Sequence, residues 1–201
     1  MRLRILDLLV CPKCADETEP FSRKYSIQGD FNETKIFDGF VKCPKGHKWQ
    51  VRDELLKFDK ISTDDFLYAV GDIEYGEVNK FPTEIEGLEK DFINLNREAA
   101  SLALNQKKLI AVRGSPLIFL ESLENVDRPI IIINPDEKVL RQCQEIAAKN
   151  GFFDYLSVVK ANAVTYSDPS RIFEISIIED AGMASIQIIK KDEKLILLNN
   201  S

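Results

Sequence analysis

Hydrophobic residues in the second half of the chain alternate between short continuous runs and one stretch with a helical period. The runs "KKLIAV" (107–112) and "RPIIIIN" (128–134) predict buried strands, since a continuous isoleucine run is typical of a parallel sheet covered on both faces. Residues 135–149 predict an amphipathic helix, which Asn134 is expected to cap. Its apolar positions recur with the helical period: Val139, Leu140, Cys143, Ile146 and Ala147.

Three later runs, "YLSVVKA", "FEISIIED" and "KLILLNN", predict further strands. Strands that alternate with helices indicate a parallel, doubly wound sheet of the α/β class. We therefore expect residues 107–201 to form a Rossmann-like domain.

The first 60 residues have a different pattern. Turn signals stand at "CPKC", "QGD", "FDGF" and "CPKGH", and the short alternating runs "RKYSIQ" and "GFVKC" predict the strands of a hairpin. A region this short cannot bury a large core by itself. Residues 1–60 therefore predict a small β domain that needs an additional cross-link.

Residues 61–106 predict a helical connector between these two domains. "STDDFLYAV" has the features of a helix start, and "GDIEYGEVNKFP" predicts a loop. The following residues predict an amphipathic helix with these apolar positions: Ile85, Leu88, Phe92, Leu95, Ala99, Leu102 and Ala103.

Composition and charge narrow the class of protein. The chain has 201 residues, 44% of them apolar and 30% charged, which is an ordinary globular balance. No apolar run reaches the roughly 20 residues of a membrane helix, and the start lacks the features of a signal peptide. The net charge of −6 argues against a nucleic-acid-binding surface over the whole chain. Residues 1–60 carry 12 Lys and Arg against 10 Asp and Glu, however, so this part could contact RNA or an acidic partner.

Three of the four cysteines and the single histidine lie in the first 47 residues. Cys11 and Cys14 are separated by two residues, and Cys43 and His47 by three, with Gly46 in the second turn. Two close pairs of thiolate and imidazole ligands are typical of a tetrahedral zinc site, and four protein ligands indicate a structural rather than a catalytic ion. The alternatives are a redox Cys-x-x-Cys pair and a chance cluster. A redox pair is expected to open a helix within a βαβ unit, which "CPKCADETEPF" does not resemble.

These residues carry a resemblance to known families. "LDLLVCPKC" and "DGFVKCPKGHKWQVRDEL" resemble the zinc ribbon of the small activator subunits of tRNA and protein methyltransferases. They are also similar to the N-terminal zinc module of certain rRNA guanine methyltransferases, in which the second ligand pair is Cys-x3-His. The resemblance covers about residues 3–58 and implies zinc bound by Cys11, Cys14, Cys43 and His47. It departs from the families where "DELLKF" replaces a Gly-Ile-Pro exit.

Residues 107–201 resemble the first five strands of a class I S-adenosylmethionine-dependent methyltransferase. The resemblance implies cofactor contacts from Gly114 in the turn after the first strand, from Asn134 at the ribose position and from Asn162 at the adenine position. The turn "RGSP" keeps one glycine, and Asn134 replaces the usual acid, so S-adenosylmethionine binding is expected to be weak or absent. Asn134 as a simple helix cap is the alternative interpretation. No catalytic residue is assigned.

Three functions remain open. The first is a non-catalytic or weakly active methyltransferase-like protein whose zinc module binds a partner protein or RNA. The second is an active S-adenosylmethionine-dependent methyltransferase acting on RNA or protein, and the third is a Rossmann module that binds a small ligand. Because cysteine clusters without a secretion signal are typical of the reducing cytosol, a cytoplasmic protein without membrane contact is expected.

Overall fold

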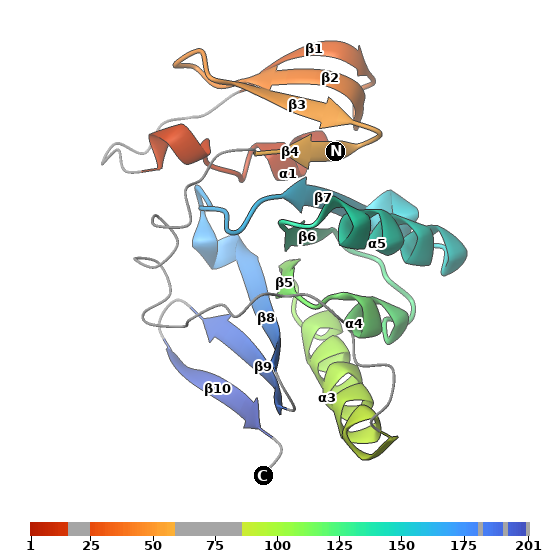
Figure 1. The fold of residues 1–201 in the computed structure, drawn as a ribbon. Coiled ribbons are helices and arrows are strands. Elements are labelled where there is room, and N and C mark those ends of the chain that lie inside the picture. Colours follow the sequence, from red (N-terminus) through yellow and green to blue (C-terminus); the bar gives the residue numbers. More distant parts are fainter. Residues whose placement is uncertain (16–24, 59–85, 181–182, 191–192, 200–201) are drawn as a thin grey trace.

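The computed structural model describes the chain in five stretches: residues 1–15, 25–58, 86–180, 183–190 and 193–199. Its strands form one ten-stranded sheet in the order β1-β2-β3-β4-β7-β6-β5-β8-β9-β10 (Figure 1). The strands are β1 (Ser26–Phe31), β2 (Ile36–Lys42), β3 (Lys48–Arg52), β4 (Leu55–Lys57), β5 (Leu109–Gly114), β6 (Ile130–Asn134), β7 (Leu156–Lys160), β8 (Ile172–Asp180), β9 (Met183–Lys190) and β10 (Glu193–Asn199). The fold is therefore mixed α/β with a partly parallel sheet.

Short and long helices accompany this sheet. The α-helices are α1 (Leu3–Leu6), α3 (Glu86–Leu104), α4 (Leu117–Glu121) and α5 (Glu137–Lys149), and the 3₁₀ turns are η1 (Pro12–Cys14), η2 (Phe153–Tyr155) and η3 (Pro169–Arg171). In the part of the chain that the structure describes, no helix is both long and apolar enough to cross a membrane.

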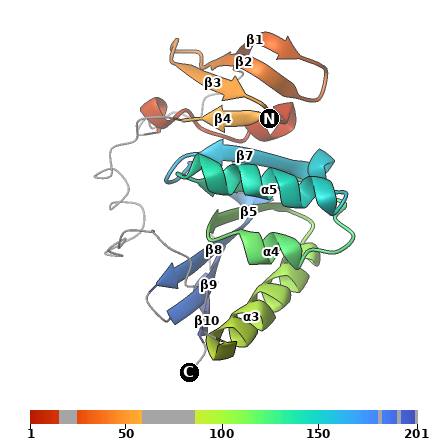
Figure 2. The same ribbon diagram turned by 45° about the vertical axis from the view of Figure 1, so that its right-hand side comes forward.

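The centre of the sheet is parallel and contains the strands that the isoleucine pattern predicts. β4, β7, β6, β5 and β8 are parallel neighbours, and Ile110 of β5 pairs with Ile130 of β6. Alternate side chains enter two cores. Ile132 packs with α3, α4 and α5 on one face, whereas Ile133 packs with α1 and the β2–β3 hairpin on the other. Figure 2 shows α5, α4 and α3 following one another along the same face.

The far end of the sheet corrects the prediction of a wholly parallel, doubly wound domain. β8 pairs antiparallel with β9, and β9 pairs antiparallel with β10, which contains the predicted strand "KLILLNN". Only residues 181–182 connect β8 to β9, and a connection this short permits antiparallel pairing alone. The sequence patterns also miss β9 and the short helix α4.

The two long helices agree with most of the predicted apolar positions. On α5, Leu140, Cys143 and Ala147 are buried, while Val139 and Ile146 are partly buried against the same core. On α3 the buried members of the predicted set are Phe92, Leu95, Ala99 and Ala103, whereas Leu102 is exposed. The predicted helix at 62–70, the loop that follows it and Ile85 lie outside the described residues, as does the side chain of Leu88.

The cysteine-rich region joins the same sheet. β1 and β2 form the predicted hairpin, and β3 and β4 extend it until β4 pairs in parallel with β7, Leu55 opposite Val158. The Arg141 guanidinium on α5 fastens the β3–β4 turn by donating to the Asp53 carbonyl at 3.2 Å and approaching the Asp53 carboxylate at 3.3 Å. The proposed domain boundaries near residues 60 and 106 stay a prediction.

Candidate metal centre

Two turns from distant parts of the chain build the candidate metal centre. Cys11 precedes η1 and Cys14 is its last residue, and the Cys14 N–H donates to the Cys11 carbonyl at 2.8 Å. Cys43 and His47 enclose the turn between β2 and β3, closed by the Cys43 N–H, which donates to the His47 carbonyl at 3.0 Å. Gly46 in this turn has φ +91°, a conformation that glycine adopts without strain. Both local turns therefore present their ligand atoms toward the same point.

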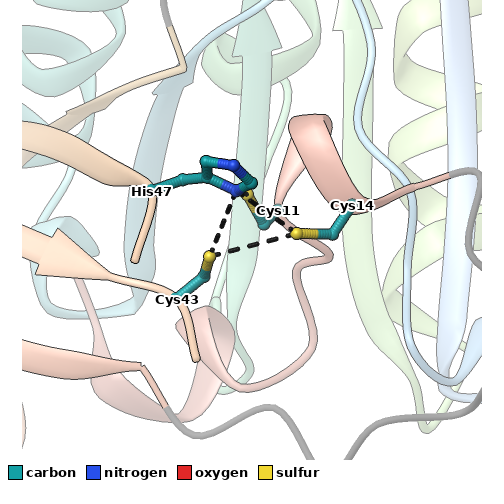
Figure 3. Close-up of side chains that lie close together, drawn as sticks. All are labelled: Cys11, Cys14, Cys43 and His47. Atoms are coloured by element: carbon teal, nitrogen blue, oxygen red, sulfur yellow. Dashed lines mark hydrogen bonds between the residues drawn. The ribbon is translucent and has the colours of Figure 1, made fainter. Parts of the chain in front are cut away.

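The four ligand atoms lie close together (Figure 3). The Nδ1 atom of His47 lies 3.4–3.6 Å from the sulfur atoms of all three cysteines. The Sγ atoms of Cys14 and Cys43 are 4.0 Å apart, and all four ligand atoms lie within 4.8 Å of one another. This cluster could hold one metal ion.

Burial and hydrogen bonding set the protonation of the thiols without metal. Burial raises the pKa of Cys14 to about 12 and also raises the pKa of Cys11. At Cys43, burial raises the pKa, but backbone N–H groups of His47 and Lys45 outweigh it, so the pKa is lower than usual. A metal ion would therefore displace protons from Cys11 and Cys14.

One residue next to the cluster was not given a role by the sequence patterns. The Trp49 Nε1–H donates to Cys11 Sγ at 3.3 Å, and Trp49 is 5% exposed. Its ring packs edge-on against Phe58, with ring centroids 5.2 Å apart. The sequence signal for this role was the alternation of polar and apolar residues along β3. Trp49 and Val51 both point inward, so the indole lies on the side of the ligands.

Two of the residues that the second resemblance assigns to the cofactor, Asn134 and Gly114, form a hydrogen bond with each other. Asn134 Nδ2 donates to the Gly114 carbonyl at 2.8 Å, and Asn134 Oδ1 accepts from the Asp136 N–H at 2.7 Å. Asp136, not Asn134, caps α5, since its side chain accepts from the Lys138 N–H at 2.8 Å. Asn134 is 8% exposed and has both polar atoms of its side chain occupied.

The turn after β5 also lies tightly against β8. Gly114 has φ +88°, and a Cβ atom there would lie 1.8 Å from the Ile177 carbonyl oxygen. The neighbouring Arg113 forms a half-buried ion pair with Glu174 at 2.7 Å. Burial raises the pKa of Glu174, and the Arg113 charge opposes this.

The structure therefore brings Gly114 and Asn134 into contact. Asn162 follows β7 and is half-buried, beside Ala161, whose N–H donates to the Asn134 carbonyl at 3.2 Å. All three residues lie near the carboxyl ends of parallel strands, as the resemblance implies, and Asn134 and Gly114 share one hydrogen bond there.

The comparisons with known proteins give no family assignment: no family model matches the chain, and no curated protein matches it significantly.

Proposed function

We propose that the chain is a zinc-binding, methyltransferase-like protein without methyltransferase activity, whose zinc module binds a partner. The closed cluster of Cys11, Cys14, Cys43 and His47 is the observation that carries this proposal. With zinc–ligand distances of about 2.0–2.3 Å, tetrahedral geometry separates sulfur from nitrogen by about 3.5 Å and sulfur from sulfur by about 3.8 Å. The observed separations of 3.4–3.6 Å and 4.0 Å support such an ion.

The ligand set favours a structural role for the ion. Three thiolates and one imidazole complete a tetrahedron and leave no open position for water or substrate. Cys11, Cys14 and Cys43 are buried in the same core cluster as Trp49, so the ion would hold η1 and the β2–β3 turn together. When bound, zinc supplies cross-linking energy to the fold rather than Lewis-acid catalysis.

Metal analysis of the purified full chain tests this part of the proposal. We expect one equivalent of zinc per chain by elemental analysis and by native mass spectrometry. The Cys14→Ser variant should lose the metal, while Cys143→Ser, a control at a cysteine outside the cluster, should retain it. A wild-type protein that contains no metal and does not take up zinc after reduction contradicts the proposal.

The contact between Asn134 and Gly114 supports the absence of methyl transfer. The Asn134 side chain already donates to the Gly114 carbonyl and accepts from the Asp136 N–H, so one N–H and one oxygen lone pair are left for ribose hydroxyls, without a charge to strengthen those bonds. The turn against Ile177 also limits the approach of a cofactor to the backbone of Gly114. An Asn134→Asp change removes the donor to Gly114, so it should not create a cofactor site.

Calorimetric titration with S-adenosylmethionine tests this second part. Neither wild type nor Asn134→Asp should bind at micromolar concentration. Micromolar binding by the wild-type protein overturns this part and favours an active methyltransferase. This result leaves the zinc proposal intact, because the two measurements are independent.

Two exposed aromatic side chains support partner binding by the zinc module. Phe31 and Phe40 lie on the β1–β2 hairpin and are 48% and 46% exposed. Exposed aromatic residues are enriched at protein interfaces and also stack on RNA bases. A protein or RNA that binds specifically to the wild-type chain should not bind to the Phe40→Ser variant. The metal content of this variant should be unchanged. Equal binding to both proteins contradicts a role for this hairpin.

A further inference from the structure

A cavity of about 540 Å³ lies at the amino ends of three neighbouring parallel strands. Five cationic side chains line it: Arg4, Lys107, Lys108, Arg128 and Arg171. Gly114 and Asn134 lie at the opposite, carboxyl ends of β5 and β6. The cavity is therefore separate from the cofactor position that the methyltransferase resemblance implies.

The sheet topology explains why these cations converge. Lys107 and Lys108 directly precede β5, Arg128 lies two positions before β6, and Arg171 directly precedes β8. In the sheet β5 lies between β6 and β8 and is parallel to both, so the three amino ends meet at one edge. Arg4 reaches the same cavity from α1.

Most of this positive charge has no ion-pair partner among the residues that the structure describes. Among the described residues of the lining, Asp127 is the one carboxylate, and it pairs with its neighbour Arg128 at 2.9 Å. Within the part of the chain that the structure describes, Arg4, Lys107, Lys108 and Arg171 form no ion pair, and all four are exposed. Four unpaired cations around one cavity repel one another, and the chain as a whole carries −6. A bound polyanion would remove this repulsion.

We propose that this cavity binds a ligand with a diphosphate or longer phosphate chain. A diphosphate carries roughly −3, because each phosphate contributes about −1.5 to −2, and this charge offsets most of the charge of the four cations without a described ion pair. The arginine guanidiniums can each donate two parallel hydrogen bonds to phosphate oxygens, and lysines bind phosphate as point charges. The volume is in the range of sites for small ligands, so a nucleotide or a terminal phosphate chain of RNA fits the cavity.

The proposal does not depend on zinc or on S-adenosylmethionine. The test uses the full chain after loading with metal. The metal content is measured first, so that loss of the metal is not mistaken for loss of phosphate binding. Inorganic pyrophosphate is the probe, measured by calorimetry at low and at physiological salt. We expect saturable binding at one site that weakens as salt increases.

Variants identify the site. Arg171→Gln and the double variant Lys107→Gln/Lys108→Gln should each weaken pyrophosphate binding about tenfold or more, because each removes charge-assisted contacts. Lys138→Gln is the matched control, since Lys138 is an exposed lysine on the first turn of α5, beyond the carboxyl end of β6. It should leave binding unchanged. The absence of saturable binding, or an equal loss in Lys138→Gln, overturns the proposal.

Three further ligands distinguish the source of the phosphate. Adenosine diphosphate that binds more tightly than a 5′-triphosphate RNA oligonucleotide supports a nucleotide ligand, and the reverse order supports an RNA end. Either order supports a phosphate site in this cavity if Arg171→Gln weakens the binding of both ligands. An oligoaspartate peptide of matched charge that binds as tightly as pyrophosphate overturns the preference for phosphate.

Discussion

The Trp49 indole N–H donates a hydrogen bond to Cys11 Sγ at 3.3 Å, from a position where the ring is almost completely buried. A donor to a thiolate stabilises its negative charge and holds the sulfur in the direction of the metal. Trp49 would therefore support a metal ion bound at this candidate centre without being a ligand itself.

Trp49→Phe should lower zinc affinity by about tenfold, because it removes the donor but keeps an aromatic ring against Phe58. Competition with a chromophoric chelator measures this change. Tyr25→Phe is the control, since it removes a buried hydrogen bond to the Leu9 carbonyl in the same core. Equal zinc affinity in Trp49→Phe and wild type shows that the indole has a packing role only.

The number of thiols that become reactive when the metal is removed should equal the number of cysteine ligands. In the zinc-loaded protein, all four cysteines should resist a thiol reagent, because three bind metal and Cys143 is completely buried. Burial raises the pKa of Cys143 to about 12, which keeps it as an unreactive thiol. A chelator should release three reactive thiols, identified by mass spectrometry, while Cys143 stays unmodified. Four thiols that react without chelator contradict a metal-bound cluster.

Gly114→Ala should destabilise the protein by several kcal/mol. The new Cβ would lie 1.8 Å from the Ile177 carbonyl oxygen, and φ +88° is strained for alanine. Gly151→Ala separates the two effects, because Gly151 has φ +77° with no atom within 4 Å of the added Cβ. This control should cost only about 1–2 kcal/mol in chemical denaturation. Equal losses in both variants contradict the close approach of β8.

Acid should weaken the contact between β4 and α5. Lys57 of β4 pairs with Glu137 of α5 at 2.8 Å, and this hydrogen bond keeps the pKa of Glu137 below its ordinary value of 4.5. A carboxylate whose folded pKa is lowered stabilises the fold above its ordinary pKa, and this contribution is lost as pH falls through the lowered value. Because the Glu137 side chain is 34% exposed, solvent screens the pair, which should contribute only roughly 0.5 kcal/mol.

Denaturation of wild type and Glu137→Gln between pH 7 and pH 3 checks this expectation. Glu137→Gln should be slightly less stable at pH 7, and the difference should disappear toward pH 3. A difference that grows as the pH falls contradicts the assigned sign.

Local patterns in the sequence predict the parts of the molecule whose partners are close along the chain. Cys11 with Cys14, and Cys43 with His47, occupy single turns, so their spacing alone indicates paired ligands. Helix α5 follows from a 3.6-residue period that its own residues display. The adjacency of β5 and β6 agrees with the general rule that consecutive strands of an α/β sheet are usually neighbours.

The remaining features depend on partners that no local pattern specifies. The isoleucine run predicts burial on both faces of the sheet, but not which segments cover each face, and the structure places Ile132 in one core and Ile133 in the other. By sequence Asn134 is a helix cap or a ligand contact, and only the structure shows that its side chain donates to the carbonyl of Gly114, 20 residues away.

The sequence by itself determined the ligand types and their spacing, the buried strands and the amphipathic helices, because these depend on covalent neighbours and on hydrophobic period. Only the tertiary structure decided that β4 continues the central sheet, that β9 and β10 run antiparallel, and that Arg4, Lys107, Lys108, Arg128 and Arg171 share one cavity. Strand pairing brings together residues that are far apart in sequence, and its free energy comes from backbone hydrogen bonds and shared burial that form only in the folded sheet.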